Sequence, residues 1–295
     1  MILITGATGF IGQRLGKDLL ERGEQVRILA REPGLAKGLF PKAEVVKGDI
    51  LDRDSLKRAL RGTDQVVHLA ALISYTTPGQ ELWKVNVDGT RNLVELAKDA
   101  EKFLFSSSVS VYGQTREPAT EEQLPSPRTP YGESKLEGER LVRNSGLPHA
   151  CFRIGVVYGP GSPIWAEILR FFGKGFPIPR TKNVTNLIQV GDVSRAFRIG
   201  LKKGKGVYNI AAGRSVPFVE LASLLSYHLG KKPRFWPSGL VRSLAALMGK
   251  GREIEAFTLN REYSIEKARK ELGFSPAVRL EAGLKEMVEW YKGLG

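Results

Sequence analysis

Residues 2–12, Ile2-Leu-Ile-Thr-Gly-Ala-Thr-Gly-Phe-Ile-Gly12, decide the fold of this 295-residue chain. Their apolar, β-branched beginning predicts a strand, and the amphipathic stretch from Phe10 to Glu21 predicts a helix. Glycines between a strand and a helix permit a tight turn, a close approach to pyrophosphate and close helix–strand packing. The helix start adds oriented N–H groups and a partial positive charge. We therefore expect a dinucleotide to bind here, in contact with Gly6, Thr8, Gly9, Phe10, Ile11 and Gly12.

Strands and helices alternate through the first half of the chain. Short β-branched runs predict further strands at 25–30, 44–47, 65–69, 103–108 and 150–154. Amphipathic stretches predict helices at 55–60, 82–98 and 131–144. Alternation at this spacing is typical of a parallel sheet covered by helices on both faces, and right-handed crossovers make such a sheet doubly wound. The sequence therefore predicts an α/β fold of the Rossmann type.

The pattern changes after Tyr158-Gly-Pro-Gly161, where proline-rich turns separate predicted helices at 165–172, 218–229, 240–248, 265–272 and 280–291. One more strand, 206–210, is expected to rejoin the sheet. We expect a dinucleotide-binding domain at 1–157 and a smaller, mainly helical substrate-binding lobe at 158–295.

Composition narrows the class of protein. The chain is 42% hydrophobic, which suffices for a sizeable core. None of its apolar stretches approaches the roughly 18 residues that a membrane span needs, so no membrane partner is expected. We expect the first strand to begin at Ile2, and therefore do not expect a cleavable signal peptide. A single cysteine, Cys151, excludes an internal disulfide, and three scattered histidines show no ligand spacing. We expect a cytoplasmic protein with a metal-free mechanism.

The net charge of +14 has two readings: a nucleic-acid or anionic-surface partner, or a soluble protein with a solvated basic surface that binds an anionic cofactor. Basic residues are interspersed with acidic ones, and the densest cluster, Lys202-Lys-Gly-Lys205, is short and predicted to be a turn. We favour the solvated surface and do not expect a nucleic-acid partner.

Tyr131-Gly-Glu-Ser-Lys135 carries the candidate proton chemistry. Residues four apart share one face of a helix, so the phenol and the ammonium can reach one site. A phenol has a pKa of about 10, and a neighbouring cation favours its ionised form. Ser108 ends an apolar run upstream and can hold a substrate oxygen beside the phenol. These residues predict a catalytic set of Ser108, Tyr131 and Lys135 that moves a hydride and a proton together.

The end of the second strand predicts cofactor choice. Enzymes that select NAD usually place an acid there for the ribose 2′-hydroxyl, whereas this chain has Ala30-Arg31-Glu32. A guanidinium fits a 2′-phosphate with paired hydrogen bonds, so Arg31 favours NADP over NAD. The alternative is a surface Arg31, with Glu32 serving the ribose.

Asp49 and Asn86 each have two possible roles that the sequence does not separate. Asp49 follows the third strand and is expected either to accept a bond from the adenine amino group or to cap the helix near Ser55. Asn86 lies within a predicted helix, where asparagine is a poor helix former. It either orients Lys135 or a water, or bonds a neighbouring loop.

These residues resemble the extended short-chain dehydrogenase/reductase family, also called NAD-dependent epimerase/dehydratases, over nearly the whole chain. Its TGxxGxxG pattern is met by Thr5 to Gly12, and its catalytic residues are matched by Ser108, Tyr131 and Lys135. Further matches are Asp49, His68-Leu-Ala-Ala71, Asn86, Val111-Tyr-Gly113, Val157-Tyr-Gly-Pro160 and Leu272-Gly-Phe-Ser-Pro276.

The resemblance implies a nicotinamide cofactor and a homodimer built from helices 82–98 and 131–144 as a four-helix bundle. Besides the residues already named, it implies cofactor contacts at Ile50, Leu69, Ala70, Ala71, Ser106 and Ile154.

Two departures bear on the substrate. Sugar-nucleotide enzymes of the family carry an asparagine where this chain has Val156, and a diphosphate-binding arginine where it has Thr185. Losing the guanidinium removes a strong, charge-assisted contact. We therefore expect a reductase or dehydrogenase acting on a secondary alcohol or ketone, like dihydroflavonol reductases and hydroxysteroid dehydrogenases. The alternatives are a nucleotide-sugar epimerase similar to UDP-glucose 4-epimerase and a cofactor sensor without turnover.

Overall fold

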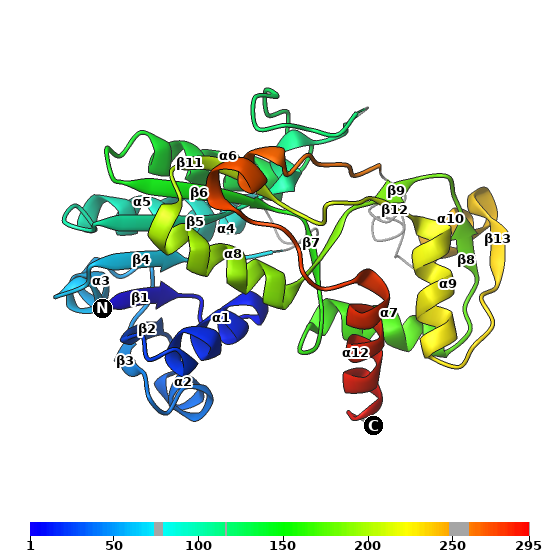
Figure 1. The fold of residues 1–295 in the computed structure, drawn as a ribbon, viewed down its shortest axis with the longest axis horizontal. Helices are drawn as coiled ribbons and strands as arrows, with labels where there is room; N and C mark the ends of the chain where they lie inside the picture. Colours follow the sequence, from blue (N-terminus) through cyan, green and yellow to red (C-terminus); the bar gives the residue numbers. More distant parts are fainter. Residues whose placement is uncertain (74–78, 116, 248–259, 295) are drawn as a thin grey trace.

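A computed structural model describes residues 1–73, 79–115, 117–247 and 260–294 (Figure 1). Within this part of the chain the largest sheet has seven strands in the order β11-β6-β5-β4-β1-β2-β3, and each neighbouring pair is parallel. The chain enters the sheet at its middle, builds one edge and returns to build the other, so the predicted doubly wound α/β fold is confirmed. The strands are β1 (Ile2–Thr5), β2 (Val26–Ala30), β3 (Glu44–Lys47), β4 (Gln65–His68), β5 (Lys102–Ser108), β6 (His149–Ile154) and β11 (Gly206–Ile210).

Helices cover both faces of this sheet (Figure 1). Successive strand residues point to opposite faces, so Ile4 joins one apolar core and Leu3 the other. The core around Ile4 lies under α1 (Phe10–Glu21), α2 (Pro33–Leu39) and α8 (Val190–Lys203). The core around Leu3 lies under α3 (Arg53–Leu60), α5 (Gly89–Leu96) and α6 (Pro130–Arg143).

The second lobe packs around its own apolar core, made by α7 (Pro163–Gly173), α9 (Phe218–His228) and α12 (Leu280–Lys292). It lies to the right of the sheet in Figure 1. Helix α10 (Ser238–Leu247) packs beside the paired short strands β8 (Ile178–Arg180) and β13 (Phe235–Pro237). Two further short pairs are β7 (Val156–Tyr158) with β10 (Leu187–Gln189) and β9 (Val184–Thr185) with β12 (Val216–Pro217). The predicted end of the 240–248 helix, Met248, lies outside the described residues.

Helix α8 was not predicted, and the reading of Lys202 and Lys203 as a turn was wrong, because both end this helix. Its buried face is apolar at helical spacing, with Val193, Phe197 and Leu201 packed against the sheet. The strand at 206–210 rejoins the sheet as predicted, beside β6. Together with α8 it returns part of the second half of the chain to the sheet.

The predicted helix over 82–98 is interrupted. It forms as α4 (Gly79–Trp83), a π-helical segment η1 (Lys84–Asp88) and α5, which ends at Leu96. The helix predicted at 265–272 likewise contains a π-helical segment, η3 (Ala268–Leu272), packed on α8. Such segments insert one extra residue into a helix and are frequent at functional sites.

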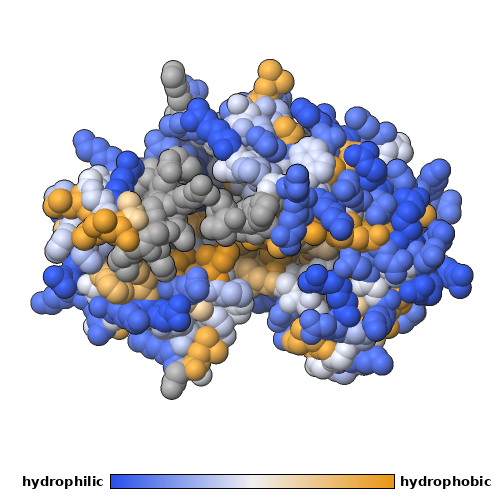
Figure 2. Space-filling view, turned by 180° about the vertical axis from the view of Figure 1, so that it is seen from behind, coloured by the Kyte–Doolittle hydropathy of each residue, from blue (hydrophilic) through white to orange (hydrophobic). Residues whose placement is uncertain are grey.

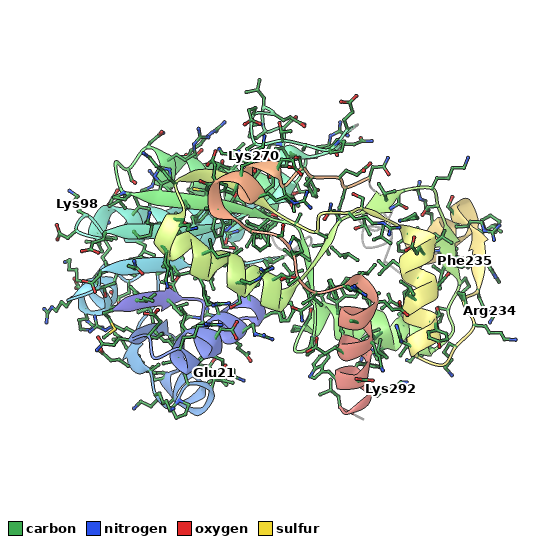
Figure 3. The ribbon with its side chains drawn as sticks, viewed as in Figure 1. Glu21, Lys98, Arg234, Phe235, Lys270 and Lys292 are labelled. Atoms are coloured by element: carbon green, nitrogen blue, oxygen red, sulfur yellow. The ribbon has the colours of Figure 1, made fainter. Side chains whose placement is uncertain are left out.

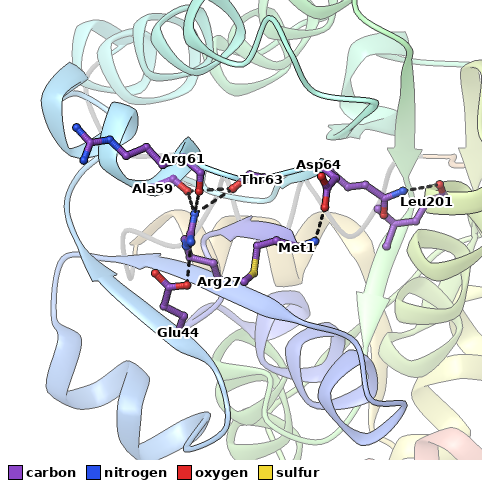
Figure 4. Close-up of polar contacts among 9 residues, drawn as sticks. Met1, Arg27, Glu44, Ala59, Arg61, Thr63, Asp64 and Leu201 are labelled. Atoms are coloured by element: carbon purple, nitrogen blue, oxygen red, sulfur yellow. Dashed lines mark hydrogen bonds and ion pairs between the residues drawn. The ribbon is translucent and has the colours of Figure 1, made fainter.

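At the amino ends of the strands, Arg27 of β2 holds the end of α3 and the loop after it (Figure 4). Its guanidinium donates to the carbonyls of Ala59 and Arg61 and pairs with Glu44 at 2.9 Å. This edge is the opposite one from the glycine turn, so these contacts hold the sheet without occupying the candidate site.

Candidate functional site

The glycine turn joins β1 to α1 at the carboxyl edge of the sheet. Gly6 has a φ of +73°, which favours glycine, and a Cβ there would lie 2.5 Å from the amide nitrogen of Ala70. A Cβ on Gly12 would lie 2.2 Å from the carbonyl oxygen of Gly6. The turn therefore packs directly against the end of β4, and larger residues at either position would force it open.

The start of α1 leaves its backbone donors available. Gly9 is the N-cap, no side chain bonds the first turn, and the first turn holds no acidic residue. These N–H groups and the helix dipole suit a phosphate. A Cβ built on Gly9 would meet only the Gly6 carbonyl oxygen, at 3.3 Å, so the outer side of the turn is open. The residues present fit a dinucleotide phosphate.

His68, at the end of β4, is buried and bonded on both ring nitrogens. Its Nδ1 lies 2.7 Å from Thr5 Oγ1, and its Nε2 lies 2.9 Å from Thr90 Oγ1. Burial, helped by the cation of Lys135, lowers the pKa of His68 to about 3. His68 is thus a neutral, packed side chain that links β1, β4 and α5.

Asn86 lies in the π-helical segment and bonds two separate elements. Its Oδ1 accepts from the Leu72 amide at 2.7 Å, and its Nδ2 donates to the Leu72 carbonyl at 3.0 Å and to Ser134 Oγ at 2.9 Å. The loop contact that the sequence left open is therefore formed. The bond to Ser134 also fixes α6 next to Lys135.

Helix α6 carries the phenol of Tyr131 and the amine of Lys135 near its start. Thr129 caps it by accepting from the Gly132 amide at 3.1 Å, and Pro130 occupies its first turn. A Cβ on Gly132 would lie 2.7 Å from the Ser110 carbonyl oxygen, so the helix start packs closely on the segment after β5. Tyr131 follows Pro130 directly and is buried.

Lys135 lies one turn further along α6 and is only 3% exposed. Its Nζ lies 4.4 Å from the centre of the Phe105 ring. Burial lowers the pKa of Lys135 to about 7, although the negative charge of Glu139 opposes this change. The amine can therefore carry or release a proton near neutral pH.

Ser108 ends β5 and is buried. Its hydroxyl accepts from the Ser110 amide and donates to Ser110 Oγ, both at 3.1 Å. Because α6 packs on Ser110, the structure brings the Ser108 segment and the start of α6 together. Ser106 lies two residues earlier on the same strand and is half-buried.

The remaining predicted cofactor residues follow strand ends along this edge. Arg31 is exposed directly after β2. Asp49 does not cap α3, so that reading was wrong; Asp52 is the N-cap and accepts from the Asp54 amide. One carboxylate oxygen of Asp49 accepts from the Leu51 amide at 2.9 Å. Residues at or just beyond other strand ends are Ile50, Leu69, Ala70, Ala71 and Ile154.

A buried polar network behind α6 was missed by the sequence reasoning. Arg153 of β6 donates to both carboxylate oxygens of Glu139, at 2.7 and 3.0 Å, and to Tyr112 Oη at 2.9 Å. Tyr112 donates in turn to Asn209 of β11 at 2.7 Å. The sequence carried a signal for this network, because Arg153 stands in an apolar strand and Glu139 stands on the buried face of a helix.

On the lobe side, Thr185 is 8% exposed and pairs with Val216 of β12. Trp165 is buried in the lobe core and donates to the Val157 carbonyl at 2.9 Å. Phe171 and Phe176 stack with ring centres 4.7 Å apart. Trp165 thus belongs to the lobe core.

Among the residues that the structure describes, no group of three or more His, Cys, Asp or Glu side chains could hold a metal ion. Within the same residues, no helix combines the length and the apolar character needed to cross a membrane.

Comparison with known proteins gives consistent matches. A model of the NAD dependent epimerase/dehydratase family matches residues 2–211. The chain is 30% identical to a putative UDP-glucose 4-epimerase of Methanocaldococcus jannaschii, over 99% of its own length and 98% of the relative's.

Solved structures resemble the whole chain. UDP-glucose 4-epimerase of Thermotoga maritima, with UDP-glucose, is 27% identical with a TM-score of 0.83, covering 99% of both chains. UDP-glucose 4-epimerase of Thermus thermophilus, in complex with NAD, is 26% identical with a TM-score of 0.81, covering 100% of this chain and 99% of the other.

Proposed function

We propose, from the premise that this chain belongs to the NAD dependent epimerase/dehydratase family and is an enzyme of the extended short-chain dehydrogenase type, that it epimerises a nucleotide sugar. The proposal rests on one arrangement above all. Tyr131 and Lys135 lie one turn apart on α6, whose start packs on the segment that follows Ser108. Relatives that match over the whole chain act on, or are bound to, UDP-sugars.

When bound at the glycine turn, a nicotinamide dinucleotide supplies the hydride acceptor and donor. The chain's own residues handle the proton and the substrate oxygen. Tyr131 takes the proton from the sugar hydroxyl and returns it after the ketone has turned its other face. Ser108 donates a hydrogen bond to the same oxygen, exchanging its present contact with Ser110 for the substrate.

Lys135 supports this exchange through its charge. When protonated, it favours the ionised phenol of Tyr131, and when neutral it can accept a proton passed on from the phenol. Its pKa of about 7 places both forms within reach at neutral pH. Asn86, through Ser134, holds the turn of α6 that carries it.

The choice of cofactor remains open to a direct test. Neighbouring structures contain NAD, whereas the exposed Arg31 favours a 2′-phosphate. Dissociation constants for NAD and NADP with wild type and Arg31→Ala separate the two. Tighter NADP binding that Arg31→Ala abolishes supports NADP; tighter NAD binding, unchanged in the variant, ends that reading.

A second candidate is a reductase or dehydrogenase of a secondary alcohol or ketone. The observation that favours it is the absence of a positive charge at Thr185 and of an amide at Val156. Thr185 is buried against β12 and offers no guanidinium for a diphosphate.

One assay distinguishes the two. Conversion of UDP-glucose to its 4-epimer without net change in nicotinamide absorbance supports the epimerase. Cofactor-dependent absorbance change with simple ketones, and no reaction of any sugar nucleotide, replaces it with the reductase. The Tyr131→Phe variant serves as the inactive control in both arms.

We also propose a homodimer through α4, α5 and α6, as the family resemblance implies. Helix α4 packs beside α6, and its Trp83 is 43% exposed. Sedimentation of wild type and Trp83→Glu tests this: a dimer that the variant dissociates supports it, and a monomeric wild type rejects it.

A further inference from the structure

Helix α10 exposes an apolar stripe on the second lobe. Leu240, Leu244 and Leu247 are 58%, 45% and 86% exposed. They recur at helical spacing and so share one face. A neighbouring side of the helix is used for packing, because Val241 and Ala245 are buried. Trp236, just before the helix, is 37% exposed. We call Trp236, Leu240, Leu244 and Leu247 the α10 stripe.

The segment that carries the stripe is basic. Residues 231–247 contain Lys231, Lys232, Arg234 and Arg242 and no acidic residue. Lys231, Lys232 and Arg234 are exposed, and within the described part of the chain they form no ion pair. Arg234 lies at the outer edge of the lobe, on the side away from the sheet (Figure 3). Exposed apolar side chains also stand out on the lobe, at the left of Figure 2.

The combination of exposed apolar side chains and exposed basic side chains favours one class of ligand over the others. Nucleic acid would satisfy the cations but gains little from three exposed leucines. A second copy of this chain would cover the leucines but would bring like charges together. An anionic lipid surface satisfies both: basic side chains lie at the headgroups, and leucine and tryptophan enter the boundary with the acyl chains.

We propose that the α10 stripe and its basic flank dock this protein on the surface of an anionic lipid bilayer. The docking is peripheral and needs no spanning helix. It departs from the sequence-based expectation of no membrane partner, and it assigns a role to part of the net charge of +14. It is independent of the proposed reaction.

The first test is co-sedimentation of the full chain with vesicles. Equimolar phosphatidylcholine and phosphatidylglycerol should bind it, phosphatidylcholine alone should not, and added salt should weaken binding. Tryptophan emission should shift to the blue on binding, and Trp236→Phe should lose most of the shift. Equal binding to neutral and anionic vesicles, or none to either, overturns the proposal.

Matched variants locate the surface. Leu244→Glu should weaken vesicle binding about tenfold or more, while Leu124→Glu, at an 85% exposed leucine in another part of the chain, should not. Lys231→Glu combined with Lys232→Glu should also lose about tenfold or more, against less than about twofold for Lys202→Glu with Lys203→Glu. Circular dichroism should show all four folded, since these positions are exposed.

Two results would replace the lipid surface with another partner. Binding to duplex DNA that the Lys231/Lys232 variant abolishes and Leu244→Glu leaves intact, without vesicle binding, assigns the charge to nucleic acid. A dimer that Leu244→Glu dissociates, again without vesicle binding, assigns the stripe to a second copy. Either result overturns the proposal.

Discussion

Arg153 of β6 and Glu139 of α6 form a buried ion pair joined by two hydrogen bonds, with side chains only 2% and 0% exposed. Glu139 lies one turn beyond Lys135, on the helix that also carries Tyr131. The pair therefore fixes the position of this helix against the sheet. Ser107 adds a third contact by donating to Glu139 at 2.8 Å.

Removing one partner should be costly, because the other charge stays buried. Glu139→Gln should lower the free energy of unfolding by about 3–5 kcal/mol. Urea denaturation of wild type and variant measures this. The exposed pair of Arg140 and Glu137 on the same helix is the control, and Arg140→Ala should change stability by no more than about 1 kcal/mol. Equal effects at both positions would contradict the role of the buried pair.

Lys135 should make stability depend on pH. Its pKa is lowered from 10.5 in the unfolded chain to about 7, so the folded state binds fewer protons between these values. Stability from this group is present above about pH 10.5 and is lost as pH falls towards about 7. Lys135→Met removes the effect, so the difference in unfolding free energy between wild type and variant should become more favourable to wild type as pH rises. A difference that does not change with pH would show that the amine is not desolvated.

A methyl group should be rejected at Gly12 in the glycine turn and accepted at Gly38 in α2. Gly12→Ala forces a Cβ against the Gly6 carbonyl and should weaken cofactor binding by at least tenfold or unfold the turn. Gly38→Ala in α2 meets nothing within 4 Å and should leave cofactor binding unchanged, with stability equal or higher by about 1 kcal/mol. Calorimetric titration with NAD and NADP gives both comparisons, and unchanged binding by Gly12→Ala would exclude the turn from the cofactor site.

Asn86 should matter to both stability and turnover. Asn86→Ala leaves the Leu72 amide and carbonyl without their partner and should cost about 2–3 kcal/mol. Turnover should fall as well, because the bond that fixes Ser134 next to Lys135 is lost. Asn92→Ala, which removes a longer bond to the Ile50 carbonyl and an exposed bond from Arg53, is the control. Full activity in Asn86→Ala would limit this residue to a structural role.

Sequence reasoning succeeded where the signal is local. Helix α1 occupies residues 10–21 as predicted, because a strand, three glycines and an amphipathic stretch stand in one continuous run. Helix α8 was not predicted, and its last two lysines, Lys202 and Lys203, were wrongly interpreted as part of a turn. The π-helical segment around Asn86 was not predicted from periodicity, and Asn86 there bonds Leu72 and Ser134, which lie on other segments.

The Glu139–Arg153 pair could not be predicted from the sequence for a different reason. Each residue is visible as a charge in an apolar setting, but their pairing depends on how α6 crosses β6. The same holds for Thr185, whose burial depends on the short β9–β12 pair. Both contacts join residues from separate elements, and no local pattern in the sequence indicates which residues meet.

Tyr131 is the group that exchanges the proton in the proposed reaction. Turnover of UDP-glucose and of a ketone panel by wild type and Tyr131→Phe, with cofactor affinity measured on the same samples, tests it directly. We predict that the variant loses about 100-fold or more of its turnover while binding the cofactor like wild type. A Tyr131→Phe variant that turns over any of these substrates at the wild-type rate would contradict the role of Tyr131 in proton exchange.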